Sequence, residues 1–210
     1  MRCDASIGSN ESRVGVSNAS TRPRAWITAA LTLLVLAFSS AIVLAESPVR
    51  ENDLRAAMLV NFARFTEWPA AVWSDPAAPF VIGVFASSDM EKALDIATRG
   101  KLVGMRTLSL QRWPNLEAAR LGSRKCQMIY VGDDSDASAR VLLREVDGQP
   151  VLMVGSGPGF ARLGGAIGFI VMDRRLRFEI SRRAVERAGL RVSSKLLELA
   201  RLVDGPRTNP

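Results

Sequence analysis

Residues 55–69 read Arg-Ala-Ala-Met-Leu-Val-Asn-Phe-Ala-Arg-Phe-Thr-Glu-Trp-Pro and place apolar side chains on most sides of a predicted helix. Leu54, Met58, Phe62 and Phe65 recur at helical spacing, and small apolar residues fill much of the opposite side. A helix of this kind is usually buried on several sides. Pro69 disfavours helix at the residue before it, so the helix is predicted to end at about Thr66. We expect later elements to pack against it.

The rest of the chain alternates apolar runs with helical patterns. Strands are predicted at 80–85, 101–110, 128–131 and 151–154, with helices over 88–98 and 136–146 between them. Residues 166–172 and 175–180 flank Asp173-Arg174 and predict a hairpin, and short helices are predicted near 182–187 and 194–202. This order predicts an α/β fold: a mainly parallel central sheet flanked by helices on both faces, with a C-terminal antiparallel hairpin.

The N-terminal segment carries the pattern of an export signal. Residues 25–45 contain no charge, and Val43-Leu44-Ala45 before Glu46 has the small-residue pattern of a signal-peptidase site. We interpret residues 1–45 as a signal peptide, residues 46–203 as one α/β domain and residues 204–210 as a disordered tail. The alternative is an uncleaved membrane anchor, since ~20 apolar residues can span a bilayer. Both interpretations place the domain outside the cytoplasm.

Composition restricts the chemistry. The chain has no histidine, and Cys126 is the one cysteine outside residues 1–45. Histidine-dependent triads, thiolate zinc sites and an internal disulfide are therefore excluded, and we predict neither an enzyme nor a metal or cofactor site. Asp133, Asp134 and Asp136 are interpreted as helix-capping acids rather than as ligands of a hard cation. Cys126 is predicted to be a buried apolar residue.

Basic residues are concentrated near the C-terminus. The chain has 28 Lys and Arg against 21 Asp and Glu, and ten of the basic residues lie between Arg174 and Arg207. Such a segment could face an acidic partner or anionic lipid, but nucleic acid does not suit an exported domain. The alternative is an ordinary solvated face.

Two stretches are candidate binding sites. Residues 155–165 are rich in glycine but match no phosphate-binding motif, so they are interpreted as a flexible connecting loop whose Phe160 and Arg162 could contact a partner. Arg191-Val-Ser-Ser194 is the better candidate, because Ser193 or Ser194 caps the last helix and Arg191 adds a bidentate cation. The alternative there is an ordinary cap with an exposed arginine nearby.

Three blocks of sequence, taken in order, resemble the YfiR-like family of bacterial periplasmic proteins. They are Ala56 to Pro69, Gly164 to Ile180 and Ala188 to Leu197, and the resemblance covers about 52–203. It implies a periplasmic repressor that binds the sensor region of an inner-membrane diguanylate cyclase and so lowers cyclic di-GMP and biofilm formation.

The resemblance also implies a site near the C-terminus. Family members are linked to small-ligand binding near the position of Arg191, so an anionic or aromatic ligand is expected there, with Glu67 and Trp68 as a neighbouring wall. Some members carry disulfides, which this chain lacks. A homodimer is left open. The alternative function is a periplasmic small-molecule binding module that serves another receptor.

Overall fold

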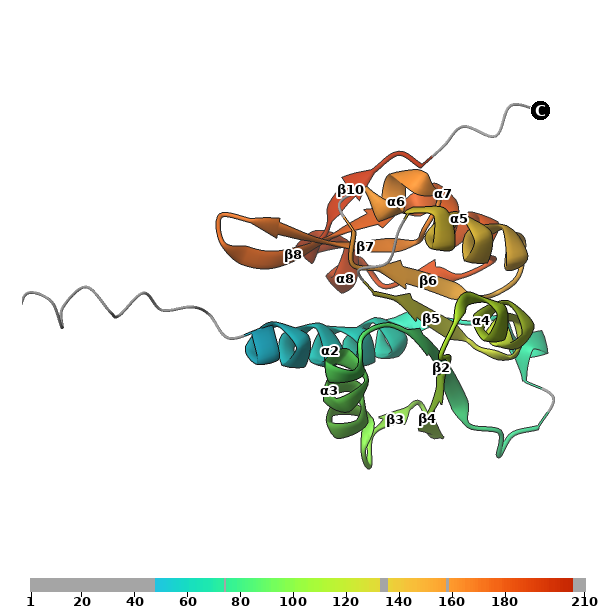
Figure 1. Cartoon of the computed structure of the whole chain (residues 1–210). Coiled ribbons are helices and arrows are strands. Elements are labelled where there is room, and N and C mark those ends of the chain that lie inside the picture. The colour runs from blue at the N-terminus through green and yellow to red at the C-terminus, as the bar shows by residue number, and fades with distance from the viewer. Residues whose placement is uncertain (1–47, 74, 133–135, 158, 206–210) are drawn as a thin grey trace, which may run out of the picture. The chain divides into compact units, whose positions relative to one another are not determined.

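The computed structural model describes residues 48–73, 75–132, 136–157 and 159–205, and the side chains from Glu51 onward (Figure 1). The predicted signal peptide and residues 206–210 of the predicted tail lie outside these ranges, as do Asp133 and Asp134 of the acidic cluster. No helix in the described part of the chain has the length and apolarity needed to cross a membrane.

Helix α2 (Pro48–Arg64) is the long helix predicted from residues 55–69. Its buried face is formed by residues spaced three and four apart: Ala56, Leu59, Val60, Phe62 and Ala63. The helix is less buried than its apolar pattern suggests, because Leu54 and Phe65 are 48% and 40% exposed. The helix also ends before Thr66, since Thr66 joins a strand pair instead.

The central sheet has eight strands in the order β10-β8-β7-β6-β5-β2-β4-β3. Strands β2, β4, β5, β6 and β7 run parallel to one another, while β3, β8 and β10 run the opposite way. The predicted fold class and the C-terminal antiparallel hairpin β7–β8 are confirmed. The strands are β2 (Phe80–Phe85), β3 (Leu102–Val103), β4 (Arg106–Arg112), β5 (Met128–Val131), β6 (Leu152–Gly155), β7 (Ile167–Met172), β8 (Arg175–Ser181) and β10 (Arg201–Val203).

Helices cover both faces of the sheet and divide the core into two clusters (Figure 1). On one face α2 and α3 (Ser88–Thr98) pack together, and Phe62 of α2 contacts Phe169 and Phe178 at ring-centroid distances of 5.6 and 5.0 Å. Residues from α7 (Arg182–Arg187) and α8 (Ser194–Leu199) join this cluster. On the other face lie α4 (Leu116–Gly122), α5 (Asp136–Glu145) and α6 (Phe160–Leu163).

Several local predictions need correction. The glycine-rich segment is not simply a connecting loop, because it contains α6 between Gly159 and Gly164, whose φ angles of 88° and 118° suit glycine. Residues 101–110 form two strands that turn at Gly104 rather than one. Helix α4 was not predicted at all.

The C-terminal strand also differs from the prediction. The last predicted helix ends at Leu199, and Arg201–Val203 instead pair in parallel with Glu179, Ile180 and Ser181 of β8. The hairpin therefore does not form the edge of the sheet. Its far half does project from the sheet, because β6 pairs only with Ile167 and Gly168 of β7 (Figure 1). We call residues 169–178 the hairpin arm.

Candidate functional site

The two segments singled out near Glu67 and Arg191 meet in a short antiparallel ribbon. Strand β1 (Thr66–Glu67) pairs with β9 (Arg191–Val192), which places Glu67 directly opposite Arg191. The N–H of Ser193 also donates to the carbonyl of Phe65 at 2.9 Å. We call residues 65–68 and 191–194 the β1–β9 ribbon. The structure thus brings together five of the seven predicted site residues: Glu67, Trp68, Arg191, Ser193 and Ser194.

Trp68 anchors this ribbon to the core rather than forming an open wall. Its ring is half-buried, its Nε1–H donates to the carbonyl of Gln127 at 3.1 Å, and it meets Phe80 edge-on at a centroid distance of 4.8 Å. Glu67 and Arg191 are exposed. Because they carry opposite charges in register, the ribbon presents a locally balanced surface rather than a purely cationic one.

Ser193 is the N-cap of α8. Its Oγ accepts from the N–H of Leu196 at 3.4 Å, while Ser194 is the exposed first residue of the helix. Because α8 has only six residues, its terminus adds little to the attraction of an anion. Anion binding at this cap stays a prediction.

The other two predicted site residues, Phe160 and Arg162, lie on α6. Phe160 is 4% exposed and fits between Gly155 and Gly165, so it belongs to the core and does not offer its ring to a partner. Arg162 is exposed, and its Nη2 lies 3.7 Å from Oε1 of Glu179. Glu179 is only 1% exposed and accepts from Nε of Arg201 at 2.9 Å. This cluster therefore ties α6 and β10 to β8.

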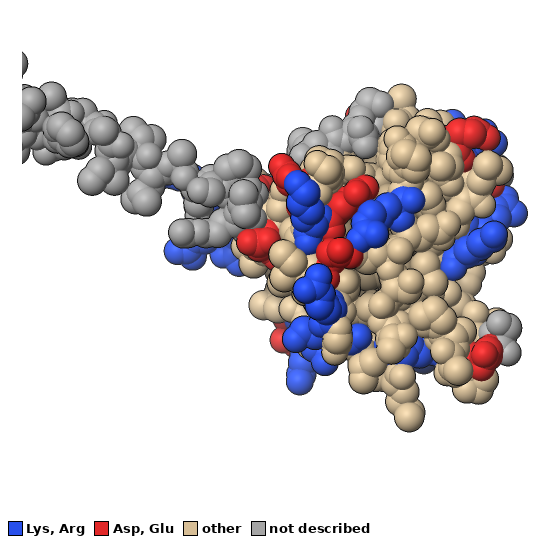
Figure 2. All heavy atoms as spheres, turned by 60° about the horizontal axis from the view of Figure 1, so that its bottom comes forward, with Lys and Arg blue, Asp and Glu red and all other residues tan. Residues whose placement is uncertain are grey.

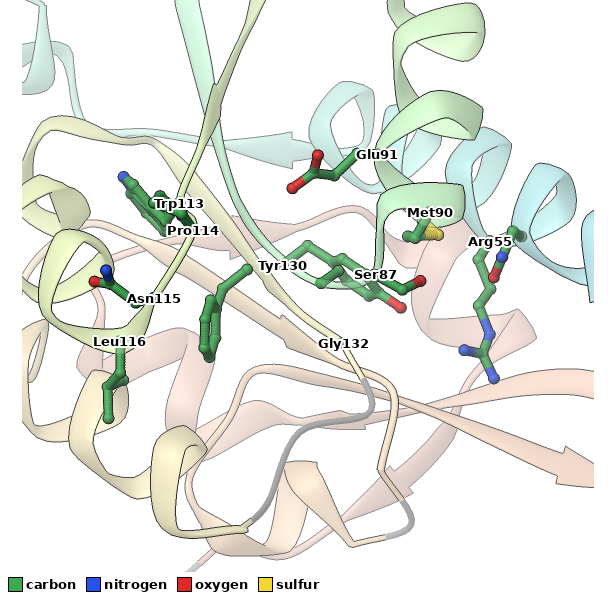
Figure 3. A pocket seen from close by; sticks show the side chains of 13 residues that line it. Arg55, Ser87, Met90, Glu91, Trp113, Pro114, Asn115, Leu116, Tyr130 and Gly132 are labelled. Atoms are coloured by element: carbon green, nitrogen blue, oxygen red, sulfur yellow. The ribbon is translucent and has the colours of Figure 1, made fainter.

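A second region, not predicted from the sequence, lies at the carboxyl ends of β2, β4 and β5. From β2 the chain turns into α3 on one face, and α5, which follows β5, lies on the other face. In open α/β sheets the crevice at such a switch of direction is where ligands bind. A cavity of about 630 Å³ lies there, and we call it the switch-point pocket (Figure 3). Its lining includes Asn52, Arg55, Phe85, Ser87, Met90, Glu91, Trp113, Asn115, Leu116, Tyr130 and Gly132.

The pocket wall formed by Trp113 depends on a glycine. A Cβ atom at Gly83 would lie 2.1 Å from Cη2 of Trp113, so only glycine lets the indole lie against strand β2. The N–H of Trp113 donates to the carbonyl of Val84 at 3.0 Å, and Asn115 then caps α4 by accepting from Ala118 at 2.9 Å. These contacts fix one side of the pocket.

Arg55 of α2 lies on the opposite side from Trp113, Pro114 and Asn115 (Figure 3). Its side chain is 12% exposed, and Nη2 lies 2.6 Å from Oε1 of Glu51. Its guanidinium carbon is 6.0 Å from the centroid of the Phe169 ring. Glu91, also in the lining, lies 3.9 Å from Nε of Arg112. The pocket thus combines a mostly buried cation with aromatic and small polar side chains.

Sequence reasoning missed this pocket because its lining comes from four separated segments. Residues 52–55, 85–91, 113–116 and 130–132 share no motif. The available signal was the alternation of strands and helices, which already implies a crevice at the carboxyl ends of the parallel strands.

Among the described residues no group of three or more His, Cys, Asp or Glu could hold a metal ion. Cys126 is buried as predicted, and burial raises the pKa of its thiol from 9.0 to about 12. A thiol with this pKa stays protonated near neutral pH and is a poor nucleophile.

Two solved structures share the fold at low sequence identity. The ABC domain from Streptococcus pneumonia in complex with L-Trp has a TM-score of 0.52 and 10% identity, and the match covers 70% of this chain and 60% of that one. A conserved domain protein from Vibrio cholerae has a TM-score of 0.51 and 10% identity, with coverages of 74% and 60%. The chain thus spans 60% of the length of each structure, and the likeness concerns the fold alone.

The match to a family model is more extensive. It covers residues 52–201, from the second turn of α2 to the first residue of β10, and includes both strands of the ribbon. A match to this family indicates a periplasmic regulator of diguanylate cyclase signalling rather than an enzyme. The chain belongs to the YfiR/HmsC-like family.

Proposed function

We propose that the domain represses an inner-membrane diguanylate cyclase by binding its periplasmic sensor region. The observation that carries this proposal is the family match over 52–201, which reaches every strand of the sheet. Repression requires the domain to bind the inactive form of the sensor more tightly than the active form, because equal affinity would shift nothing. Signal-peptide export of the domain, predicted from residues 1–45, would bring the two proteins into one compartment.

The hairpin arm and the ribbon are the surfaces that we assign to the partner. The arm carries Arg175 and Arg177 on β8, and Val171 of β7 is 62% exposed. Exposed apolar and arginine side chains together are typical of protein interfaces, and arginine would pair with acidic groups on the sensor. By contrast, the face seen in Figure 2 intersperses acidic and basic side chains.

The first test is genetic. Deleting the gene should raise cyclic di-GMP, and restoring the exported domain should lower it. Unchanged cyclic di-GMP in the deletion strain, with the partner cyclase expressed, would refute repression.

The second test compares two charge reversals of equal size. Arg175→Glu with Arg177→Glu should weaken repression, whereas Arg99→Glu with Lys101→Glu, at exposed positions near β3, should not. Both variants must melt as the unmodified protein does. If both double variants weakened repression equally, the overall charge of the domain would matter rather than the hairpin arm.

Arg191→Glu measures how central the ribbon is to the interface. Breaking a buried charge pair with the sensor would weaken binding by ~3–5 kcal/mol, while an exposed pair at the rim would cost under ~1 kcal/mol. The affinity of the purified domain for the solubilised cyclase gives this number directly.

The second candidate function is a small-molecule binding module, and the switch-point pocket is the observation that favours it. On that account the domain would bind a ligand without any protein partner. The two functions are compatible if a ligand relieves repression.

A further inference from the structure

We propose that a pocket lined by three arginines, from α5 and α7, binds a phosphate group. The three are Arg140 and Arg144 of α5 and Arg187 of α7, and we call this cavity of about 240 Å³ the arginine pocket. It shares no lining residue with the switch-point pocket and contains no residue of the β1–β9 ribbon. Binding would be a property of the domain alone, so it does not depend on whether the domain represses a cyclase.

The topology of the sheet brings these arginines together from distant parts of the sequence. Helix α5 precedes β6, and β8 runs antiparallel to β7, so α7 begins at the end of the sheet where β7 starts. A smaller adjoining cavity shares Arg187 and is also lined by Val151 and Ala166, which directly precede β6 and β7. The arginine pocket therefore lies at the amino ends of these strands, whereas the switch-point pocket lies at the carboxyl ends of β2, β4 and β5.

The three arginines keep their hydrogen-bond donors available. In the part of the chain that the structure describes, none of them has an acidic partner within 4 Å. The acid that follows Arg144 in the sequence, Glu145, is engaged elsewhere. Its Oε1 lies 3.1 Å from Nε of Arg124, and its Oε2 lies 3.8 Å from Nε of Arg120. The positive charges that line the pocket are therefore not neutralised by ion pairs within the described fold.

The charge of the lining suits a phosphate better than a carboxylate. Arg140 and Arg144 lie one turn apart on the same side of α5, where like charges repel each other. Asp147 is the one acid of the lining, so the net charge there is +2. A phosphate monoester carries up to two negative charges and three acceptor oxygens, whereas a carboxylate carries one charge and two oxygens. One phosphate group can therefore accept from all three guanidinium groups.

The size and walls of the pocket suit a compact group. Its volume lies below the range of roughly 300–1,000 Å³ that is typical of pockets for drug-sized ligands. Leu143 and Leu163 form the apolar part of the lining, and both are half-buried, as is Arg187. Attraction between charges is stronger beside such walls than in open water, because the solvent screens it less. The ligand is thus a phosphate group, either of a soluble compound or of a lipid headgroup.

The first test compares two anions at constant ionic strength. The domain purified from the periplasm is titrated at about pH 8, where phosphate is mostly a dianion, with sodium phosphate or sodium acetate, and chloride keeps the ionic strength constant. We expect phosphate to give saturable NMR shifts of the amides of Gly148, Gly164 and Arg187. Its affinity should exceed that of acetate by about tenfold or more. Equal affinities, or shifts that do not saturate, would overturn the proposal.

Two matched double variants locate the site. Arg140→Gln with Arg144→Gln should weaken phosphate binding by about tenfold or more, whereas Arg175→Gln with Arg177→Gln, in the hairpin arm, should not change it. All four side chains are exposed, so both variants should fold. Equal weakening in the two would show a response to overall charge alone and would overturn the proposal. Asp147→Asn removes the acid of the lining and should strengthen phosphate binding, a gain that misfolding cannot produce.

A vesicle assay identifies the source of the phosphate group. Cosedimentation of the domain is compared for vesicles of phosphatidylcholine with and without phosphatidic acid, whose headgroup is a phosphate monoester. Binding that requires phosphatidic acid and is lost in Arg140→Gln with Arg144→Gln would assign the pocket to a lipid headgroup. Binding of free phosphate without binding of vesicles would assign it to a soluble phosphate compound. Both results support the site, whereas the absence of both kinds of binding would overturn it.

Discussion

The ribbon and the switch-point pocket differ in how the sequence builds them. The ribbon joins two segments of four residues each, and its exposed side chains lie directly within recognisable sequence blocks. The pocket collects single residues from four segments that have no motif in common. Sequence motifs can therefore reveal a site whose residues are adjacent in the sequence. A site whose residues are brought together by the order of the strands can be found only from the topology.

The two regions also differ in the chemistry that they offer. In the ribbon the exposed Glu67 lies opposite the exposed Arg191, and the ring of Trp68 is turned to the core while that of Phe65 is 40% exposed. The pocket is concave, with fixed rings and a mostly buried guanidinium. An exposed surface of mixed charge suits a protein partner, and a concave cavity suits a small ligand.

The largest effect is expected from a methyl group placed beneath the pocket. Gly83→Ala should lower the free energy of unfolding by about 3 kcal/mol, at the upper end of typical overpacking costs, because the new Cβ would meet Trp113 at 2.1 Å. It should also shift the amide of Asn115 while leaving that of Arg191 unchanged. Chemical denaturation measures the cost.

Gly157→Ala is the matched control, since a Cβ atom added there would meet no neighbouring atom within 4 Å and the stability should hardly change. A cost below about 1 kcal/mol for Gly83→Ala would mean that Trp113 moves freely. The pocket wall would then be less fixed than the ribbon.

Alkaline pH tests whether both regions belong to one cooperative unit. Burial raises the pKa of Cys126 to about 12 in the folded protein, against 9.0 for the free thiol. The unfolded chain therefore loses this proton first as the pH rises. The contribution of the thiol to the free energy of unfolding is fully present below pH 9 and is lost between pH 9 and 12. In this range the free energy of unfolding should fall by about 1.4 kcal/mol per pH unit because of this group.

Cys126→Ala should remove this contribution to the fall in the free energy of unfolding between pH 9 and 12. Signals from Trp68 and from Trp113 should disappear at the same pH, because both side chains pack against strand β2, Trp68 at Phe80 and Trp113 at Gly83. Separate transitions would show that one region opens independently of the other.

A smaller effect is expected at the anchor of the ribbon. Trp68→Phe should cost about 1 kcal/mol, because it removes the hydrogen bond from Nε1 to the carbonyl of Gln127 but keeps a ring against Phe80. The carbonyl of Gln127 still accepts from Leu152 at 2.9 Å, which limits the loss. Thermal and denaturant melts give the cost, with Trp73→Phe as the control. A shift of the Trp113 signals in Trp68→Phe would mean that the regions are coupled.

The smallest effect concerns the cross-strand pair. A double-mutant cycle of Glu67→Ala and Arg191→Ala should give a coupling of about 0.2–1 kcal/mol, as for opposite charges on neighbouring strands. The coupling should shrink in high salt because both side chains are exposed. A coupling above about 2 kcal/mol would contradict the exposed, balanced surface described for the ribbon.

The sequence predicted the elements with strong local patterns and missed those that depend on distant partners. Helix α2, the strands of the core and the hairpin were predicted because apolar spacing marks them directly. Strand β10 was predicted as helix because Arg201–Val203 has no pattern of its own, and its pairing depends on Glu179, which lies 22 residues earlier.

The same reasoning applies to the candidate site. The meeting of Glu67 and Arg191 followed from residues in recognised blocks, whereas the burial of Phe160 could not be predicted without the glycines that surround it. Short helices such as α6 also lie below the length at which periodicity identifies an element.

Strand β10 has a consequence for chains that stop early. It covers the backbone edge of β8 at Glu179–Ser181, and Arg201 holds the carboxylate of Glu179 through its guanidinium. A product ending before Arg201 would therefore leave an open strand edge beside a buried acid that has lost this partner. Open edges recruit strands from other molecules, so such fragments should aggregate although most of the sheet is intact. We therefore expect the last described strand to lower the tendency of the folded domain to self-associate.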